Sequence, residues 1–237
     1  MRVVTQNVQA LPPMKHKQVR HDVRATALSA DVIVWQEIRP ARYRYAVRSL
    51  PRGTWAHYMG PVSGGCPISW RRRKYELVDR GSVLLHPGKR KVCERRVIAW
   101  VLLREIATGN LFIVNNAHYV SKAWSNARPA EVPMRRGIWE AGNATHRELL
   151  ARWVKSGFAV VGGGDFNRGG YPVVGEKVEN RHVHYGQFGP HVIDHLYVIN
   201  GDHVRWNPLQ SRTLDERESD HKGRQIITKP VAWRGKQ

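Results

Sequence analysis

The chain has 237 residues, of which 41% are hydrophobic and 24% charged, a balance typical of a globular protein. Its 39 lysines and arginines outnumber 19 acidic residues, giving a net charge of +20. Such an excess favours a polyanionic partner, chiefly nucleic acid, with an anionic membrane surface as the alternative. Only Cys66 and Cys93 are present, which excludes a disulfide framework and favours reduced thiols.

No secretion signal is evident at the N-terminus, and no apolar run reaches the ~18–20 residues of a transmembrane helix. We therefore expect a cytoplasmic protein without stable membrane insertion, and a monomer.

The first half of the chain combines short apolar runs with one amphipathic segment. Residues 2–8 (RVVTQNV) predict a buried strand, since the run is short and β-branched. Apolar residues recur at helical spacing over 15–29, which predicts a helix. Residues 31–35 (DVIVW) predict a second strand. Shorter strands are expected near 55–58, 67–70, 75–79 and 82–85.

In the second half, the apolar runs 95–105 and 111–118 are joined by the turn ATGN, which predicts an antiparallel hairpin. A helix is expected over 137–155. Further strands are expected within FAVVGGGDFN (158–167), within HVIDHLYVIN (191–200) and at 225–229. No linker or repeat interrupts the chain, so residues 1–237 are expected to form one domain. Strands outnumber helices without regular βαβ alternation, which predicts two packed, mostly antiparallel or mixed sheets with helices outside.

Polar residues gather at the ends of the predicted strands, where loops commonly build sites on a rigid scaffold. Each one alone is explained by backbone capping or by solvation; the whole set is not. The set comprises Asn7, Glu37, His118, Asp165, Asn167, Asp194, Asp220 and His221.

These residues lie in short motifs that resemble those of the endonuclease/exonuclease/phosphatase superfamily, in the same order and over nearly the whole chain. The motifs are QNV (6–8), DVIVWQE (31–37), NAH (116–118), GGDFN (163–167), IDH (193–195) and SDH (219–221). The resemblance implies a DNase I-like α/β fold: a four-layer sandwich of two packed mixed β-sheets flanked by helices. It also implies one or two Mg²⁺ ions, or Mn²⁺, and hydrolysis of phosphate esters.

Phosphodiester cleavage needs an activated water and neutralisation of charge on the phosphate oxygens. We expect Asp165 to orient and deprotonate the water, and Asn167 to donate an amide hydrogen to a phosphate oxygen from an extended backbone. Asp194 and His221 are expected to pair, which favours the imidazolium form of the histidine. His118 is expected to supply a second cationic or acid group.

Three residues are expected at the metal. Glu37 offers a carboxylate suited to Mg²⁺. Asn7 can hold that carboxylate or a metal-bound water, and is also a candidate for substrate binding. Asp220 is expected to give a further metal ligand or hydrogen bond. The loop after His118 adds substrate-binding candidates that could stack on bases or hold phosphates, namely Tyr119, Trp124 and Arg128. Packing of Trp124 in the core remains open.

Two departures from the superfamily pattern favour the DNase I-like or generic phosphodiesterase branch over abasic-site repair. Gln9 stands where abasic-site endonucleases carry a carboxylate, and His118 stands where they tend to carry tyrosine. A partner carboxylate for His118 is not identifiable, because residues 60–70 offer none.

Several other features have alternative explanations. The glycines at 162–164 and 169–170 are expected to let a phosphate approach the backbone, although the run does not match a nucleotide-binding GxGxxG loop. His182, His184 and His191 could form a zinc site or a basic loop near substrate. His195 is expected to face away from Asp194. The run RRRK (71–74) is either a solvated turn or a phosphate-tracking patch.

The sequence therefore predicts a Mg²⁺-dependent phosphodiester hydrolase, specifically a nuclease that acts on DNA or RNA. A phosphatase or lipid phosphodiesterase that acts on inositol phosphates or sphingomyelin is the alternative enzyme. A non-catalytic nucleic-acid-binding module is the alternative outside enzymes.

Overall fold

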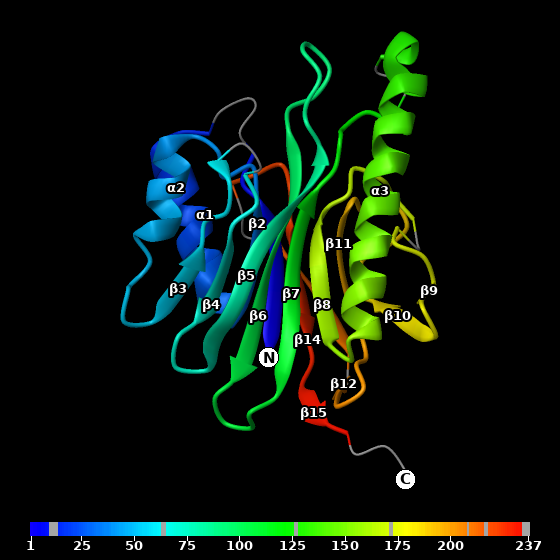
Figure 1. Ribbon diagram of the computed structural model, residues 1–237. Helices are drawn as coiled ribbons and strands as arrows, with labels where there is room; N and C mark the ends of the chain where they lie inside the picture. Colours follow the sequence, from blue (N-terminus) through cyan, green and yellow to red (C-terminus); the bar gives the residue numbers. More distant parts are fainter. Residues whose placement is uncertain are drawn as a thin grey trace.

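The computed structural model describes residues 1–9, 14–62, 65–125, 128–170, 173–207, 209–215 and 218–233. Two mixed β-sheets face each other at its centre (Figure 1). The first has the strand order β13-β14-β1-β2-β4-β3, in which only β1 and β2 are parallel. Its strands are β1 (Arg2–Asn7), β2 (Val32–Gln36), β3 (Trp55–Tyr58), β4 (Ile68–Arg71), β13 (Gln210–Leu214) and β14 (Gly223–Ile227).

The second sheet has the order β5-β6-β7-β8-β11-β10-β9, in which only β7 and β8 are parallel. Its strands are β5 (Tyr75–His86), β6 (Arg96–Glu105), β7 (Leu111–His118), β8 (Ala159–Asp165), β9 (Lys177–Val178), β10 (Arg181–Tyr185) and β11 (Asp194–Ile199). A separate pair is formed by β12 (Val204–Trp206) and β15 (Pro230–Ala232).

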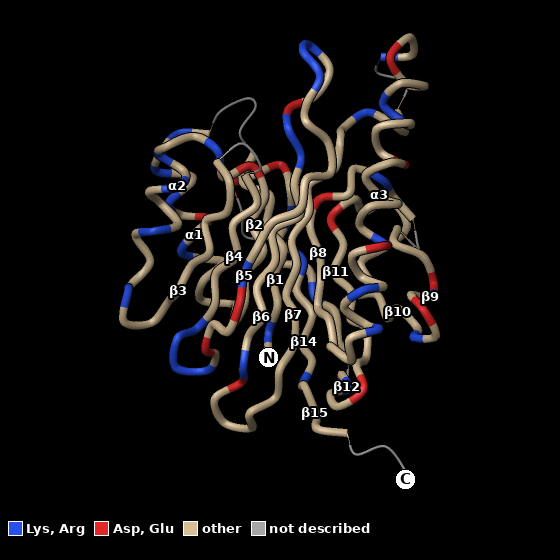
Figure 2. Tube along the Cα trace, in the orientation of Figure 1, with Lys and Arg blue, Asp and Glu red and all other residues tan. Residues whose placement is uncertain are grey.

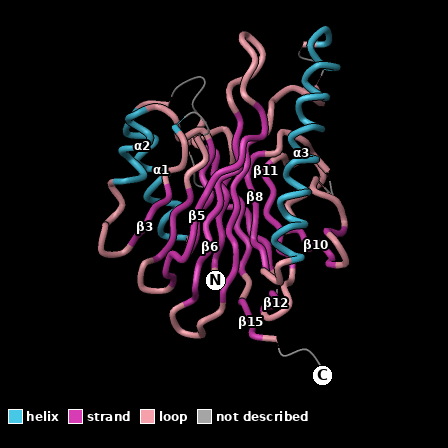
Figure 3. The backbone as a smooth tube through the Cα atoms, viewed as in Figure 1, coloured by secondary structure: helices cyan, strands magenta, loops and turns pink. Residues whose placement is uncertain are grey.

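Helices cover both outer faces, which gives four layers (Figures 1 and 3). The helices α1 (His16–Ser29) and α2 (Ala41–Arg48) lie against the first sheet, and α3 (Val132–Lys155) lies against the second, after the short 3₁₀ helix η2 (Pro129–Glu131). Three apolar clusters separate the layers, and the central one, which includes Val34, Val114 and Val161, lies between the sheets. The expected four-layer sandwich is confirmed.

The strands β9, β12, β13 and β15 were not predicted from the sequence, and three other elements differ from the sequence predictions. Residues 75–79 and 82–85 form one strand, β5, because β-bulges absorb the breaks in its alternation. The helix α3 begins at Val132 and not at 137, since Pro133 is tolerated in a first helical turn. The helix α2 was not predicted, although Tyr43, Ala46 and Val47 form its buried face.

Neither Cys66 nor Cys93 forms a disulfide, as expected. Within the described part of the chain, none of the helices is both long and apolar enough to span a membrane.

Candidate active site

Strand alternation brings the candidate side chains to one end of the space between the sheets. Inward-facing residues of a strand recur at every second position, so the face that buries Val3, Val114 and Val161 continues to the last residue of β1, β7 and β8 and, since β11 runs antiparallel to β8, to the first residue of β11. Register places His118 and Asp194 on either side of Asp165, each as its direct cross-strand partner. The inward residues at this end are Asn7, His118, Asp165 and Asp194.

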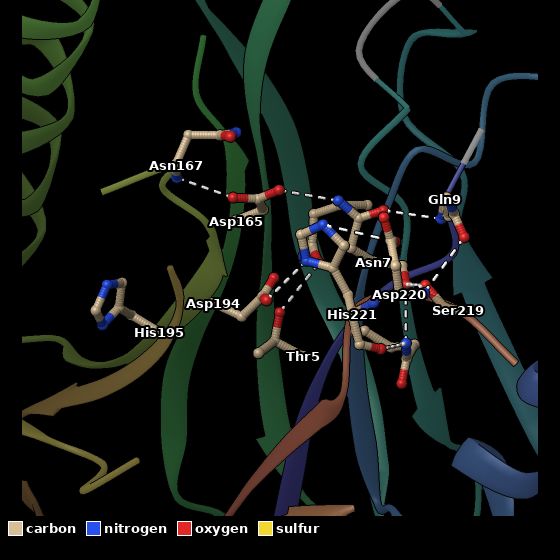
Figure 4. A network of polar contacts seen from close by, with 12 residues as sticks. Thr5, Asn7, Gln9, Asp165, Asn167, Asp194, His195, Ser219, Asp220 and His221 are labelled. Atoms are coloured by element: carbon tan, nitrogen blue, oxygen red, sulfur yellow. Dashed lines mark hydrogen bonds and ion pairs between the residues drawn. The ribbon is translucent and has the colours of Figure 1, made fainter. Parts of the chain in front are cut away.

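Asp165 ends β8 and lies at the centre of a polar network (Figure 4). One carboxylate oxygen, Oδ2, accepts a 2.9 Å hydrogen bond from Nδ2 of Asn7 and lies 3.5 Å from Nε2 of His118. The other, Oδ1, accepts a 2.8 Å bond from the backbone N–H of Asn167. Burial and the nearby charge of Asp194 raise the pKa of Asp165 to about 7. A carboxylate with such a pKa is suited to accept a proton near neutral pH.

Asp194 and His221 form the expected pair, with Oδ2 of Asp194 2.8 Å from Nδ1 of His221. Burial opposes the charged imidazole, but the hydrogen bond and charge of Asp194, together with Asp165 and Asp220, raise the pKa of His221 to about 10. The imidazolium therefore persists at neutral pH. Ser219 fixes the loop that carries this ring, because its hydroxyl donates to the carbonyl of Asn7 and accepts from the backbone of His221.

His118 has an arginine as its partner where a carboxylate was sought. Nη1 of Arg96 lies 3.0 Å from Nδ1 of His118. A guanidinium can only donate, so Nδ1 accepts and the imidazole proton is on Nε2, facing Asp165. Burial and the charge of Arg96 hold the pKa of His118 well below its usual range. The expectation of a cationic His118 is therefore corrected to a neutral imidazole.

A cleft of about 880 Å³ opens over this network. Basic and acidic groups both line it. The basic residues are Arg39, Lys89, Arg90, Lys91, Arg96 and Lys122, and the acidic residues are Glu37, Glu94, Asp165 and Asp220. Asn167, Trp124 and His221 also face the cleft.

The donor set of the cleft fits a hard divalent cation, because carboxylate oxygens dominate it. Asp165, Asp194 and His221 bring possible ligand atoms within 4.8 Å of one another, but the His221 imidazolium has no lone pair to offer, so the carboxylates are the ligands that a cation would take. Oδ1 of Asp194 is buried and has no hydrogen-bond partner among the described residues. Glu37 lines the same cleft from just after β2, with φ of 62°, in the left-handed region that residues with a side chain seldom adopt.

The expected backbone conformation of Asn167 is corrected. Asn167 does not continue the extended strand: its φ is 51°, and its amide Nδ2 donates to the carbonyl of Tyr119. Asn7 donates from Nδ2 to Asp165 and accepts at Oδ1 from the backbone N–H of Gln9, so its side chain positions the base.

The glycines of β8 admit protein neighbours, not a phosphate. A Cβ on Gly162 would lie 2.4 Å from the ring of Tyr197, and one on Gly164 would lie 1.8 Å from the carbonyl oxygen of Ala117. Gly169, beyond the strand, does line the cleft.

The substrate-binding candidates of the loop after β7 have different surroundings. Tyr119 is 2% exposed, and its hydroxyl lies 2.9 Å from Nδ1 of His146, so its expected contact with substrate is wrong. Trp124 lines the cleft, but the guanidinium groups of Arg136 and Arg168 lie over its ring. Arg128 pairs with Glu131 and is not among the residues that line the cleft.

The remaining sequence features are not among the residues that line the cleft, although His191 lies against Gly169, which does line it. His182, His184 and His191 do not form a candidate metal group within the described ranges, since the one found there is the Asp165 group. Nε2 of His195 lies 2.8 Å from the carbonyl oxygen of Arg168, facing away from Asp194 as expected. Arg71 ends β4, and the rest of the run, 72–74, forms the turn between β4 and β5.

Sequence reasoning missed the basic side of the cleft. Residues 88–95 (GKRKVCER), which we call the basic finger, form the turn between β5 and β6 and project beyond the sandwich (Figure 2). A signal was present, because four basic residues occur between two apolar runs. Arg96 was missed because a partner for His118 was sought only among carboxylates.

The chain has the DNase I-like fold of endonuclease/exonuclease/phosphatase proteins, as comparison with solved structures shows. It is similar to a mannosyl-6-phosphatase from Bacteroides thetaiotaomicron, with a TM-score of 0.72, 14% identity and coverage of 96% of this chain and 99% of that one. It is also similar to the catalytic domain of human Nocturnin with a bound sulfate anion, with a TM-score of 0.69, 15% identity and coverage of 98% of this chain and 94% of that one. For TDP2 from C. elegans the TM-score is 0.72 and the identity 13%, with coverage of 95% of this chain and 74% of that one. No protein-family model matches the chain, and no curated protein matches it.

Proposed function

We propose that the protein is a divalent-metal-dependent phosphodiesterase that cleaves nucleic acid. The observation that carries the proposal is the placement of a buried carboxylate, Asp165, beside the Asp194–His221 ion pair at the floor of a cleft rimmed by lysine and arginine. A base, a cation held in place and a basic approach surface are the elements that phosphodiester hydrolysis requires.

Glu37 and Asp220 would hold Mg²⁺ or Mn²⁺, which when bound supplies positive charge to the phosphate oxygens. Asp165 accepts the proton of the attacking water, and its two hydrogen bonds, from Asn7 and Asn167, fix its orientation. As oxygen bonds to phosphorus, the bond from phosphorus to the leaving oxygen breaks, and that oxygen takes a proton from solvent water to leave as an alcohol. The His221 imidazolium, held by Asp194, stabilises the charge that develops on phosphate.

A polymeric substrate is favoured by charge. The net charge of +20 and the lysines and arginine of the basic finger, Lys89, Arg90 and Lys91, suit a polyanionic backbone, which contacts many cations at once, better than a sugar with a single phosphate. Human Nocturnin and TDP2 share the fold, as does a mannosyl-6-phosphatase. The last neighbour supports a phosphomonoesterase as the second candidate.

Hydrolysis of a substrate panel by the purified protein tests the proposal. The panel contains plasmid DNA, RNA, an abasic-site duplex, inositol phosphates and mannose 6-phosphate, each with Mg²⁺, Mn²⁺ or EDTA. We expect cleavage of DNA or RNA with metal and none with EDTA. Hydrolysis restricted to inositol phosphates or mannose 6-phosphate would overturn the nuclease assignment and favour the phosphatase.

The matched variants are Asp165→Asn, which removes the base, and His184→Asn, at an exposed position on β10. We expect the first to lose about 10²–10⁴-fold in kcat and the second to retain activity. Equal activity of Asp165→Asn and the unmodified protein would contradict the role of Asp165.

A further inference from the structure

Arg96 carries a buried guanidinium that faces the cleft. The residue is 8% exposed and begins β6, directly after the basic finger. Nη1 contacts His118, and Nε is buried without a hydrogen-bond partner among the described residues. The side chain nonetheless lines the same cleft as Asp165 and His221.

The charge of Arg96 is not neutralised by a carboxylate in the part of the chain that the structure describes. Arg96 takes part in none of the ion pairs there, whereas its neighbour Arg39 pairs with Glu94. The imidazole that Arg96 contacts accepts a hydrogen bond but carries no negative charge. Burying an unpaired cation is unfavourable, so folded proteins rarely keep one without an anionic partner.

We propose that Arg96 is a binding residue for the phosphate that undergoes hydrolysis. Its remaining N–H groups donate to a phosphate oxygen in the cleft beside Asp165, in the planar geometry by which guanidinium groups bind phosphate. The identity of the anion as substrate rests on the proposed phosphodiesterase function.

His118 is a positioning residue in this arrangement. Its Nδ1 accepts from Arg96 and so fixes the guanidinium, while its Nε2–H faces Oδ2 of Asp165. A carboxylate partner would instead favour a charged imidazole. The positive charge beside the base is therefore on the guanidinium.

Kinetics on a small diester, bis(4-nitrophenyl) phosphate, separate phosphate binding from mere orientation of His118. We expect Arg96→Gln to lower kcat/KM about 10²–10³-fold, Arg96→Lys to lose less, and Arg96→Glu to lose most. The glutamate variant is decisive, since it gives His118 a carboxylate partner but repels phosphate. Activity of Arg96→Glu within threefold of the unmodified protein would show that Arg96 only orients the ring.

Arg104→Gln is the matched control, because Arg104 lies on the same strand but is exposed and paired with Glu76. We expect this variant to retain kcat/KM.

Thermal unfolding in inorganic phosphate gives a second test that needs no activity. A ligand that binds only the folded state raises the Tm. We expect phosphate to raise the Tm of the unmodified protein and of Arg104→Gln, but not that of Arg96→Gln. In the absence of phosphate, Arg96→Gln should have a Tm equal to or higher than the unmodified protein, since a buried unpaired charge is removed. A phosphate shift retained in Arg96→Gln would overturn the proposal.

The two tests fail in different ways. If the protein hydrolyses none of the diesters, the proposed function fails, while the phosphate shift still decides whether Arg96 binds an anion. If hydrolysis is normal in Arg96→Gln, the proposed function stands and the role of Arg96 is wrong.

Discussion

At the scale of single residues, Asp194 and His221 are expected to act as one unit. Asp194 orients the ring through the 2.8 Å contact and maintains its charge, so either residue alone gives little stabilisation of phosphate. We expect Asp194→Asn and His221→Gln each to lower kcat about 10²–10³-fold. The double variant should be no slower than the slower single variant, because residues that act as a unit are not additive.

Steady-state kinetics of the two single variants and the double variant check this coupling. Losses that multiply in the double variant would show that Asp194 and His221 contribute independently.

Gly164 is expected to be required for folding and not for phosphate access. A methyl group there would lie 1.8 Å from the carbonyl oxygen of Ala117, and φ is +140°. The backbone cannot shift without breaking the β7–β8 pairing that places His118 beside Asp165. We expect Gly164→Ala to cost more than about 3 kcal/mol or to yield insoluble protein.

Denaturant unfolding of soluble variants measures this cost, and Gly53→Ala is the matched control, since nothing lies within 4 Å of a Cβ there. A stable Gly164→Ala variant with reduced affinity for phosphate would instead indicate that the glycine admits a phosphate.

At the scale of elements, the basic finger is predicted to bind the nucleic-acid backbone. Its turn is held by backbone hydrogen bonds between Lys89 and Cys93, and Lys89, Arg90 and Lys91 line the cleft. Replacing these three basic residues with glutamine should weaken DNA binding about 10–100-fold at moderate salt. It should also reduce the slope of log K against log salt by about 0.9 for each phosphate that the variant no longer neutralises. Hydrolysis of bis(4-nitrophenyl) phosphate should be little affected.

The turn between β4 and β5 gives a control with the same change in charge. Figure 2 shows this turn at the opposite end of the sandwich from the finger. Glutamine at Arg72, Arg73 and Lys74 should leave the salt slope close to that of the unmodified protein. Equal reductions in affinity in the two triple variants, measured by fluorescence anisotropy of a labelled duplex, would attribute binding to net charge alone.

Elements were predictable from sequence where apolar periodicity was strong. The strands over 2–8, 31–35 and 111–118 and the helix over 15–29 are all present. The helix α2 was missed because its arginines dilute a buried face of only three side chains. The continuity of β5 was missed because bulges shift the alternation, which a sequence pattern does not distinguish from a turn.

At the scale of the whole molecule, the sequence predicted which residues form the site but not which atoms contact one another there. Asp165, Asp194 and His221 follow strands in the sequence, and the sheets bring them together. Which partner each atom takes depends on register and on neighbours distant in sequence. Arg96 is 22 residues from His118, and no local pattern links a guanidinium to an imidazole. Burial of Tyr119 is likewise set by α3, which packs over it.

Buried neutral histidines predict that acid destabilises the whole molecule. His146 lies inside the cluster under α3, where burial lowers its pKa to about 3, and burial together with Arg72 and Arg48 lowers the pKa of His57 to about 4. Their ordinary value is about 6.5. Above pH 6.5, both states of the protein leave these rings neutral. Below pH 6.5, the unfolded chain binds protons that the folded chain does not. The free energy of unfolding therefore decreases as the pH is lowered.

The loss is up to about 1.4 kcal/mol per pH unit for each ring, from pH 6.5 down to about 4 for His57 and about 3 for His146. Asp165 acts in the opposite direction below pH 7, because its raised pKa lets the folded state bind the proton first.

A variant comparison isolates the contribution of one ring. His146→Gln should be less stable than the unmodified protein at pH 7, since contacts with Asn115 and Tyr119 are altered, but the difference should shrink by up to about 1.4 kcal/mol for each pH unit below 6.5. Urea unfolding at pH 7, 6 and 5 measures this, and a difference that stays constant would mean that His146 has the same pKa in the folded and the unfolded protein.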